Sequence, residues 1–167
     1  WYENNKDFCG ADAFTIRRRA YFTIFAGAFG HTYGAGGIWD GLTEKEGCSE
    51  AALDAIHYRG AKQIGFVSNF FHAVGDSFLK LTPDQTLVTA GNSDEYDRHI
   101  QASVAVDGSF ALVYSASDRP YQLDLTKVSG GKLTAIWYNP RTNQYKTDHQ
   151  VHLNASDVQQ DIDPPGE

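Results

Sequence analysis

The stretch FGHTYGAGGIWDG at positions 29–41 decides how the first part of the chain folds. It places His31, Tyr33 and Trp39 among glycines, which cost conformational entropy and contribute no side-chain packing. A purely structural loop seldom needs that combination, whereas a ligand-facing loop at the end of a barrel strand often does. Within it, GHTYG (30–34) is a candidate strand, because Thr32 and Tyr33 favour extended backbone. His31 and Tyr33 alternate there and would share one face.

Helical patterns flank this stretch on both sides. Asp12 can cap a helix that starts at Ala13 and that Gly30 ends. Ser49 can cap a second helix, which Gly60 interrupts, and residues 61–74 continue as a helix with apolar side chains spaced to face a core. The run at 17–19 (RRR) reads as a solvated helix face with one inward member. This order of helix, short strand, glycine-rich loop and long helix predicts the last units of an α/β barrel.

The pattern changes near residue 80. Four short alternating segments follow at 99–106, 109–116, 121–128 and 132–139, separated by turn signals such as Asp107-Gly108. They predict a small antiparallel β-sandwich. The expected fold class is therefore α/β plus β, with barrel units over 1–80 and a sandwich over 81–167. Two β/α units cannot close an eight-stranded barrel, so we expect the missing strands to lie elsewhere.

Composition limits the function classes. The 167-residue chain carries a net charge of −7, which argues against nucleic acid or an anionic membrane as the main partner. No apolar run reaches the ~18 residues of a spanning helix. The chain has no Met and begins with Trp1, so we expect a processed product or a piece of a longer protein. Aromatic residues make up 13%, and exposed aromatic rings are one way to bind sugars.

Cys9 and Cys48 are the chain's two cysteines, and each stands in a polar, glycine-containing context without CxxC spacing. A zinc site is therefore not expected. We favour a disulfide, which indicates a secreted protein, over two free thiols. The glycosylation triplet at Asn154 agrees weakly with secretion. No carboxylate cluster completes a metal site with His149 and His152, and no cofactor is expected.

Several segments form a recognisable set of motifs: RRAY (18–21), AGA (26–28), GHTYG (30–34) with Trp39, GAKQI (60–64), PDQ (83–85), WYNPRTNQY (137–145) and PPG (164–166). They resemble motifs of the apiosidase-like glycoside hydrolases, in which a (β/α)8 barrel precedes a β-sandwich called a collagen-binding domain. The similarity runs along almost the whole chain. It implies that six or more barrel strands precede Trp1 and that the sandwich's last strand follows PPG.

The resemblance implies a secreted enzyme that cleaves O-glycosyl bonds in a plant or microbial polysaccharide or oligosaccharide. This chain would supply its C-terminal part, would partner the remaining barrel segment, and would be inactive alone. The alternative is a non-catalytic β-sandwich module that binds carbohydrate or collagen.

The resemblance places WYENN (1–5) at the end of barrel strand seven, where the family has a Glu-x-x-Tyr-Glu-like run. Glu3 matches the second Glu, and the first would precede Trp1. Glu3 is thus a candidate catalyst, with a supporting or substrate-contact role and a plain surface role as alternatives.

The resemblance places His31 where strand eight would end. There it could bond a sugar hydroxyl or a catalytic carboxylate, or it could be a structural histidine bonding loop backbone. Trp39 suits a sugar-stacking platform, with packing against the second helix as its alternative. Trp1, Tyr2 and Tyr33 complete the candidate substrate-binding residues.

Overall fold

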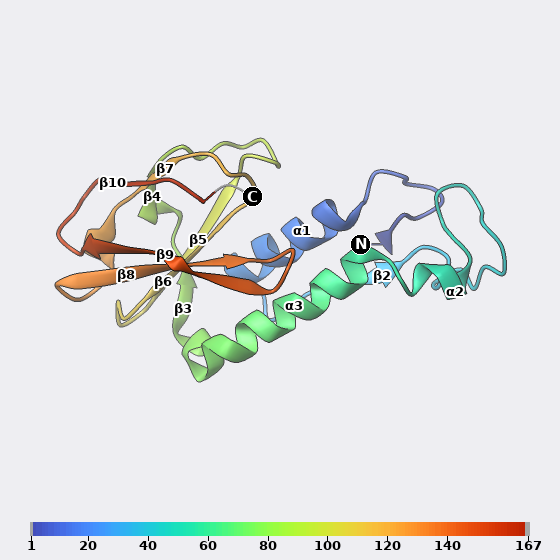
Figure 1. The fold of residues 1–167 in the computed structure, drawn as a ribbon, viewed down its shortest axis with the longest axis horizontal. Helices are drawn as coiled ribbons and strands as arrows, with labels where there is room; N and C mark the ends of the chain where they lie inside the picture. The colour runs from blue at the N-terminus through green and yellow to red at the C-terminus, as the bar shows by residue number, and fades with distance from the viewer. Residues whose placement is uncertain (1, 166–167) are drawn as a thin grey trace. The chain divides into compact units, whose positions relative to one another are not determined.

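A computed structural model gives the fold (Figure 1) and describes residues 2–165, without the side chains of 147–149. The chain divides into two compact units. The first comprises residues up to Thr23 together with Phe29–Ala73 and Pro140–Asn143. The second comprises Ile24–Ala28, Val74–Asn139 and the segment from Gln144 onward. Each unit is described by itself below.

The first unit is built on two short parallel strands and three helices. Its elements are β1 (Tyr2–Glu3), α1 (Ala13–Phe25), β2 (Gly34–Ala35), α2 (Ala52–Ala55) and α3 (Arg59–Val74). Strands β1 and β2 pair in parallel, with Tyr2 opposite Gly34 and Glu3 opposite Ala35. A helix connects the two parallel strands, which is the β–α–β arrangement of α/β proteins. Because the strands are parallel, their carboxyl ends, at Glu3 and Ala35, lie at the same edge.

Helix α1 begins at the predicted residue but ends before the predicted one. The carboxylate of Asp12 accepts a hydrogen bond from the backbone N–H of Thr15 at 2.9 Å, which confirms the predicted cap. The helix ends at Phe25, not at Gly30. Gly27 has a φ of +96°, and its N–H donates to the carbonyl of Ile24 at 3.0 Å. A glycine in a positive-φ conformation is a common way to end a helix, so Gly27 performs the role expected of Gly30.

The strand and the second helix in this unit also differ from prediction. Strand β2 begins at Gly34, so Tyr33 directly precedes it and the shared strand face argued for His31 and Tyr33 does not exist. The helix expected after Ser49 is reduced to the four residues of α2, whose cap residue Ala51 makes no side-chain capping bond. Ser49 instead donates to the backbone carbonyl of Asn4 at 2.8 Å. Gly60 does not interrupt a helix but lies in the first turn of α3.

The second unit contains three antiparallel arrangements. Strands β10 (Gln160–Ile162), β7 (Tyr121–Leu123) and β4 (Val88–Ala90) form one sheet, in that order. Strands β3 (Leu81–Pro83), β5 (Ile100–Ala105) and β6 (Ala111–Ser115) form a second. The long hairpin of β8 (Lys132–Asn139) and β9 (Gln144–Asn154) is the third. Short 3-10 helices lie at η1 (Gly75–Lys80), η2 (Gln85–Leu87) and η3 (Leu125–Lys127).

The four predicted segments are confirmed as β5, β6, β7 and β8, although the segment at 121–128 ends as η3. The turn at Asp107-Gly108 joins β5 to β6 as predicted, and Gly108 has a φ of +69° there. The short strands β3, β4 and β10 were not predicted. The core of this unit draws its buried side chains from several sheets: Leu87, Ile100, Ala102, Val104, Tyr121, Leu123, Leu125, Leu153 and Ile162.

Candidate functional site

Glu3, the last residue of β1, is in direct contact with Tyr33, the residue that precedes β2. Glu3 is only 3% exposed, which excludes the surface role considered for it. Its Oε2 accepts a hydrogen bond from the Tyr33 hydroxyl at 2.9 Å. Its Oε1 accepts a hydrogen bond from the backbone N–H of Gly60 at 3.1 Å. One carboxylate thus joins the end of β1, the residue before β2 and the first turn of α3.

Gly60 leaves the space that this carboxylate fills. A Cβ at position 60 would overlap the carboxylate of Glu3. The distance between them would be shorter than any that real Cβ atoms keep from other groups. Sequence reasoning placed Gly60 in a family-like segment and expected it to interrupt the second helix, with no role at the site. A glycine in the first turn of a helix was the available signal, because glycine weakens a helix unless a close approach requires it.

Burial raises the pKa of the Tyr33 hydroxyl well above its usual range, and the hydrogen bond and negative charge of Glu3 raise it further. Tyr33 is therefore a neutral hydrogen-bond donor at physiological pH. The direction of the Tyr33–Glu3 bond follows from this, with the hydroxyl donating and the carboxylate accepting. The pair is a fixed structural feature of the strand ends.

His31 does not join the Glu3–Tyr33 pair among the described contacts. Its ring is half-buried, and its Nε2 is buried without a hydrogen-bond partner in the part of the chain that the structure describes. Buried polar atoms in proteins nearly always have a partner. Burial lowers the pKa of His31, and nearby positive charge, including that of Arg19, adds to this. His31 is therefore biased toward its neutral form, in which one ring nitrogen donates and the other accepts.

Tyr2 and Trp39 form an aromatic pair beside the strand ends. Their ring centroids lie 5.4 Å apart, with the planes tilted by 44°. Trp39 is 71% exposed and follows β2, where its backbone N–H donates to the carbonyl of Ala35 at 3.1 Å. Trp1, the third aromatic candidate, lies outside the described residues. The pair offers an accessible ring face next to the edge where Glu3 ends β1.

Close backbone approach explains the glycines of 34–37. A Cβ at Gly34 would overlap the ring of Tyr2, one at Gly36 would overlap the carbonyl of Asn4, and one at Gly37 would overlap the carbonyl of Glu50. Gly37 also has a φ of +85°, which side chains rarely adopt. The glycines therefore let the loop pack against β1 and against the segment at 49–50. Their presence by itself does not indicate a ligand.

Helix α1 buries more charge than predicted. Arg17 and Arg18 are 7% and 8% exposed, so two arginines face inward where one was expected. Both guanidinium groups lie over the ring of Phe14, at 5.5 Å and 5.0 Å from its centroid. Arg17 also donates to the side-chain oxygen of the buried Gln63 on α3. An aromatic face and an amide oxygen partly replace the water that these groups lose.

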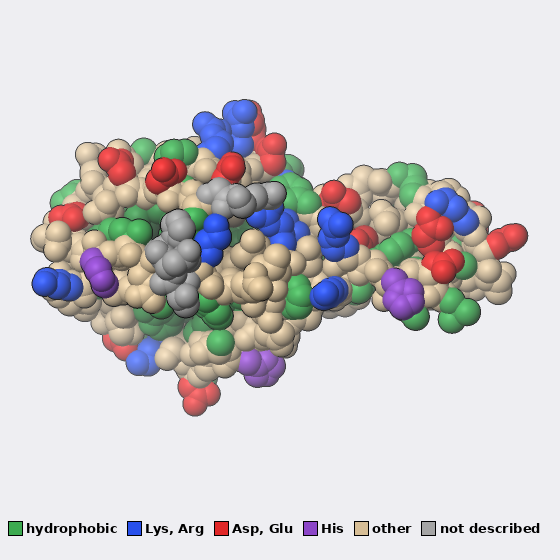
Figure 2. Space-filling view, viewed as in Figure 1, with side chains coloured by type: hydrophobic (Ala, Val, Ile, Leu, Met, Phe, Trp, Pro, Cys, Tyr) green, Lys and Arg blue, Asp and Glu red, His purple; other side chains and the backbone are tan. Residues whose placement is uncertain are grey.

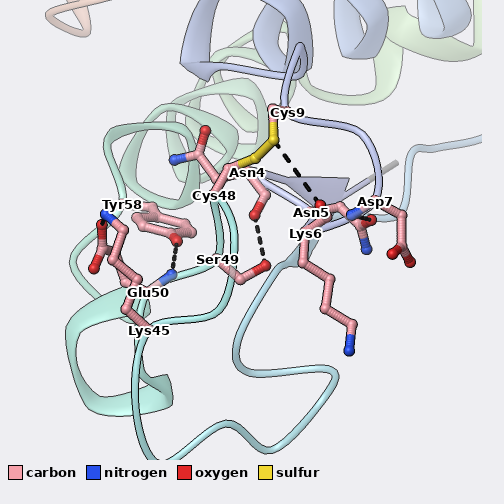
Figure 3. Close-up of a disulfide and its surroundings, with 10 residues drawn as sticks. All are labelled: Asn4, Asn5, Lys6, Asp7, Cys9, Lys45, Cys48, Ser49, Glu50 and Tyr58. Carbon is pink, nitrogen blue, oxygen red and sulfur yellow. Dashed lines mark hydrogen bonds and ion pairs between the residues drawn. A yellow bond between two sulfur atoms is a disulfide. The ribbon is translucent and has the colours of Figure 1, made fainter.

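A disulfide links Cys9 to Cys48, as predicted (Figure 3). The two Cα atoms are 5.5 Å apart, and the bridge spans 39 positions of sequence. Figure 3 shows the hydrogen bond from Ser49 to Asn4 beside the bridge, together with the bond from the N–H of Glu50 to the Tyr58 hydroxyl. The bridge and these bonds fix the loop after β2 against the start of the chain.

Among the side chains that the structure describes, at 2–146 and 150–165, no three His, Cys, Asp or Glu gather in a way that could hold a metal ion. None of the described helices has the length and apolar character needed to cross a membrane. Acidic and basic side chains are interspersed on the face drawn in Figure 2. Asn154, at the end of β9, has an exposed side chain.

Comparison with known proteins places both parts of the chain. Residues 1–75 match the family described as "Apiosidase-like, catalytic domain". Residues 82–167 match the family described as "Putative collagen-binding domain of a collagenase". A search of curated proteins finds no match.

Two solved structures are similar along nearly the whole chain. A glycoside hydrolase family 5 protein from Bacteroides vulgatus has 27% sequence identity and a TM-score of 0.82, and the match covers 99% of this chain and 36% of that one. A protein described as a glycoside hydrolase has 26% identity and a TM-score of 0.79, covering 93% of this chain and 34% of that one. The chain thus spans about a third of the length of these proteins. The chain belongs to the domain family matched at 82–167, which covers half of its length, and its residues 1–75 are similar to the apiosidase-like catalytic domain.

Proposed function

We propose that this chain is the C-terminal part of a secreted glycoside hydrolase that acts on a plant or microbial polysaccharide. The observation that carries the proposal is the parallel pairing of β1 and β2, with the Tyr2–Trp39 aromatic pair beside them, in a segment that matches an apiosidase-like catalytic domain. Barrel enzymes build their active sites at the carboxyl ends of the strands, and Trp39 follows that end of β2. The carboxyl groups that glycoside hydrolysis requires beside the scissile bond would come from the rest of the full-length protein. Residues 1–80 would complete a (β/α)8 barrel, and residues 81–167 would form an accessory β-sandwich.

The proposal gives the aromatic pair the role of holding a sugar ring. Trp39 is exposed and lies against Tyr2, so a pyranose face could stack on the indole while the phenol supports it from the side. Trp1 stays a candidate substrate-binding residue on the family resemblance alone, because it lies outside the described residues. His31 would bond a sugar hydroxyl or a carboxylate from the rest of the barrel, because its buried Nε2 lacks a partner among the described residues.

Two features support a secreted location. The Cys9–Cys48 disulfide is typical of oxidising compartments, since cytosolic proteins keep their thiols reduced. The Asn154 triplet is accessible to modification, because its side chain is exposed at the end of a strand. Both features belong to this proposal and are independent of the catalytic argument.

The test is hydrolysis by the full-length protein that carries this chain. We expect it to cleave members of a panel of aryl glycosides, including apiosides and arabinofuranosides, and we expect residues 1–167 alone to be inactive. Trp39→Ala should lower kcat/KM by roughly 3- to 10-fold, the equivalent of losing about 0.5–1.5 kcal/mol of ring contact. Phe8→Ala is the matched control, because Phe8 is an equally exposed aromatic residue of the same unit without a place in the Tyr2–Trp39 pair.

A second candidate function follows from the match at 82–167. We infer that this part could bind carbohydrate or collagen without taking part in catalysis. Two exposed aromatic side chains, Tyr96 and Tyr145, favour it, and Tyr145 lies 5.0 Å from Tyr138 between ring centroids. Co-sedimentation of the protein with insoluble polysaccharides and with fibrillar collagen tests this function. Binding that Tyr145→Ala abolishes while hydrolysis persists would support it.

A further inference from the structure

We propose that Glu3 is a positioning residue, which caps helix α3 from a distant strand and aligns the ends of β1 and β2 in the catalytic domain. The inference rests on the proposed function only where it predicts how changes at Glu3 affect enzyme activity. It assigns the carboxylate to the protein framework, in place of the catalytic role that the family-like sequence suggested. Three observations support it: the hydrogen bonds of Glu3, the N-terminus of α3 that it contacts, and the space that Gly60 leaves for its carboxylate.

The carboxylate of Glu3 is directed into the protein. The residue is 3% exposed, and each oxygen already accepts a hydrogen bond, one from Gly60 and one from Tyr33. A group that exchanges a proton with substrate must come within hydrogen-bond reach of it. With Glu3 3% exposed and both oxygens in contact with protein groups, its carboxylate is directed toward Gly60 and Tyr33 and away from solvent. It has the environment of a buried carboxylate that its hydrogen bonds compensate.

Helix α3 needs an anion at its N-terminus, and its own sequence does not provide one. The first N–H groups of a helix have no partner within the helix, and they favour negative charge. The first turn of α3 contains no acidic residue. Glu3 supplies the missing charge from 57 positions away, through its bond to the N–H of Gly60. A side chain on β1 therefore does for α3 what a local capping residue usually does.

Tyr33 extends this connection to β2. Its hydroxyl donates to the second oxygen of Glu3 from the position directly before the strand. The main chain makes a parallel connection, because the N–H of Gly36 donates to the carbonyl of Glu3 at 2.8 Å. Side-chain and backbone bonds of one residue therefore hold β2 on both sides of Ala35. The position of any pocket residue within 31–39 depends on this alignment.

The experiment separates positioning from proton transfer in the full-length enzyme. In Glu3→Gln the amide oxygen can still accept from Gly60, and the amide N–H can donate to the Tyr33 oxygen, so both contacts persist. We expect kcat of Glu3→Gln to stay within about 10-fold of the wild type, with both limbs of the pH–rate profile retained. A loss of kcat of about 1,000-fold or more, or the loss of one limb, with an unchanged Tm would overturn the inference.

The glycine provides a second variant. In Gly60→Ala the new Cβ displaces the Glu3 carboxylate without removing it. We expect Tm to fall by about 5 °C or more and kcat to fall with it. Gly65→Ala is the matched control, because Gly65 lies in the same helix with open space around it and should keep or raise Tm. Equal Tm values for the two variants would contradict the inference.

The two proposals fail separately. If the wild-type enzyme cleaves no glycoside, the proposed function fails. The Tm comparison between Gly60→Ala and Gly65→Ala still decides whether Glu3 caps α3.

Discussion

The hydroxyl of Ser49 donates to the backbone carbonyl of Asn4 at 2.8 Å, next to the bridge between Cys9 and Cys48. Ser49 is fully buried, so this bond cannot be replaced by water without local opening. The covalent bridge and the hydrogen bond therefore act on the same contact between the start of the chain and the loop after β2. Their contributions to the free energy of unfolding should differ in size.

Replacing both cysteines, as Cys9→Ser with Cys48→Ser, should lower the free energy of unfolding by about 4 kcal/mol. The chain-entropy estimate for a closed loop of this length gives that value. Denaturant unfolding with a fluorescence readout measures it. Ser49→Ala should cost only about 1–3 kcal/mol, because it leaves one buried carbonyl without a partner. A double-cysteine variant as stable as the wild type would show that the bridge contributes nothing to stability.

The lowered pKa of His31 predicts that stability depends on pH. The unfolded chain takes up a proton near the ordinary histidine pKa, about 6.5, whereas the folded chain resists protonation until lower pH. In that window the unfolded state binds more protons, so the free energy of unfolding falls as the pH falls. The loss levels off below the folded-state pKa. His31→Gln should flatten this part of the profile.

Unfolding measured at a series of pH values from about 7.5 to 5 tests this. His57→Gln is the control, because His57 is exposed and no described hydrogen bond involves its ring. A His31→Gln variant with the same pH slope as the wild type would assign the dependence to other groups.

The glycine-rich stretch at 29–41 shows how far sequence can indicate function. The sequence alone suggested a ligand-facing loop, and the structure explains Gly34, Gly36 and Gly37 by close approach to Tyr2, Asn4 and Glu50. Those contacts are between residues up to 32 positions apart, so periodicity within the stretch could not reveal them. The aromatic candidates stood out by residue type and by their position in the family-like segments. The Glu3–Gly60 contact did not, because the partner is a backbone N–H.

Gly36→Ala should destabilise the first unit, and Gly30→Ala should not. A methyl group at 36 would overlap the Asn4 carbonyl and the Ser49 hydroxyl, whereas nothing lies within 4 Å of one at 30. Forcing a Cβ into packed backbone costs about 1–3 kcal/mol. Gly30→Ala should be neutral or slightly stabilising, because it restricts the unfolded chain. Thermal unfolding of the two variants side by side measures the difference, and equal values would show that the loop can move away from β1.

Local signals predicted some elements well and others poorly. The Asp12 cap and the Asp107-Gly108 turn act within a few residues, and both are present. The Ser49 cap was wrong, because a tertiary partner, the Asn4 carbonyl, takes the hydroxyl instead. Strands β3, β4 and β10 are only three residues long, too short for an alternating pattern to stand out. Whether these residues form strands depends on the strands with which they pair.

The PDQ segment at 83–85 also makes tertiary contacts, through Gln85, and they yield a last prediction. The side-chain oxygen of Gln85 accepts from the N–H of Ala102 at 2.6 Å and from the amide of Gln101 at 3.0 Å. Its Nε2 donates to the carbonyl of Ile100 at 2.7 Å. One side chain thus satisfies backbone groups of β5 that its strand neighbours leave open.

Gln85→Ala should lower the free energy of unfolding by about 2–4 kcal/mol, since it leaves the Ala102 N–H and the Ile100 carbonyl without partners. Gln85→Glu keeps the acceptor and loses the donor, so it should be destabilised at neutral pH and recover as acid protonates the carboxylate. Gln159→Ala, at an exposed position, should change stability by less than about 0.5 kcal/mol. If Gln85→Glu showed no recovery at low pH, the donor to Ile100 would be dispensable, and the acceptor to Ala102 alone would account for the role of Gln85.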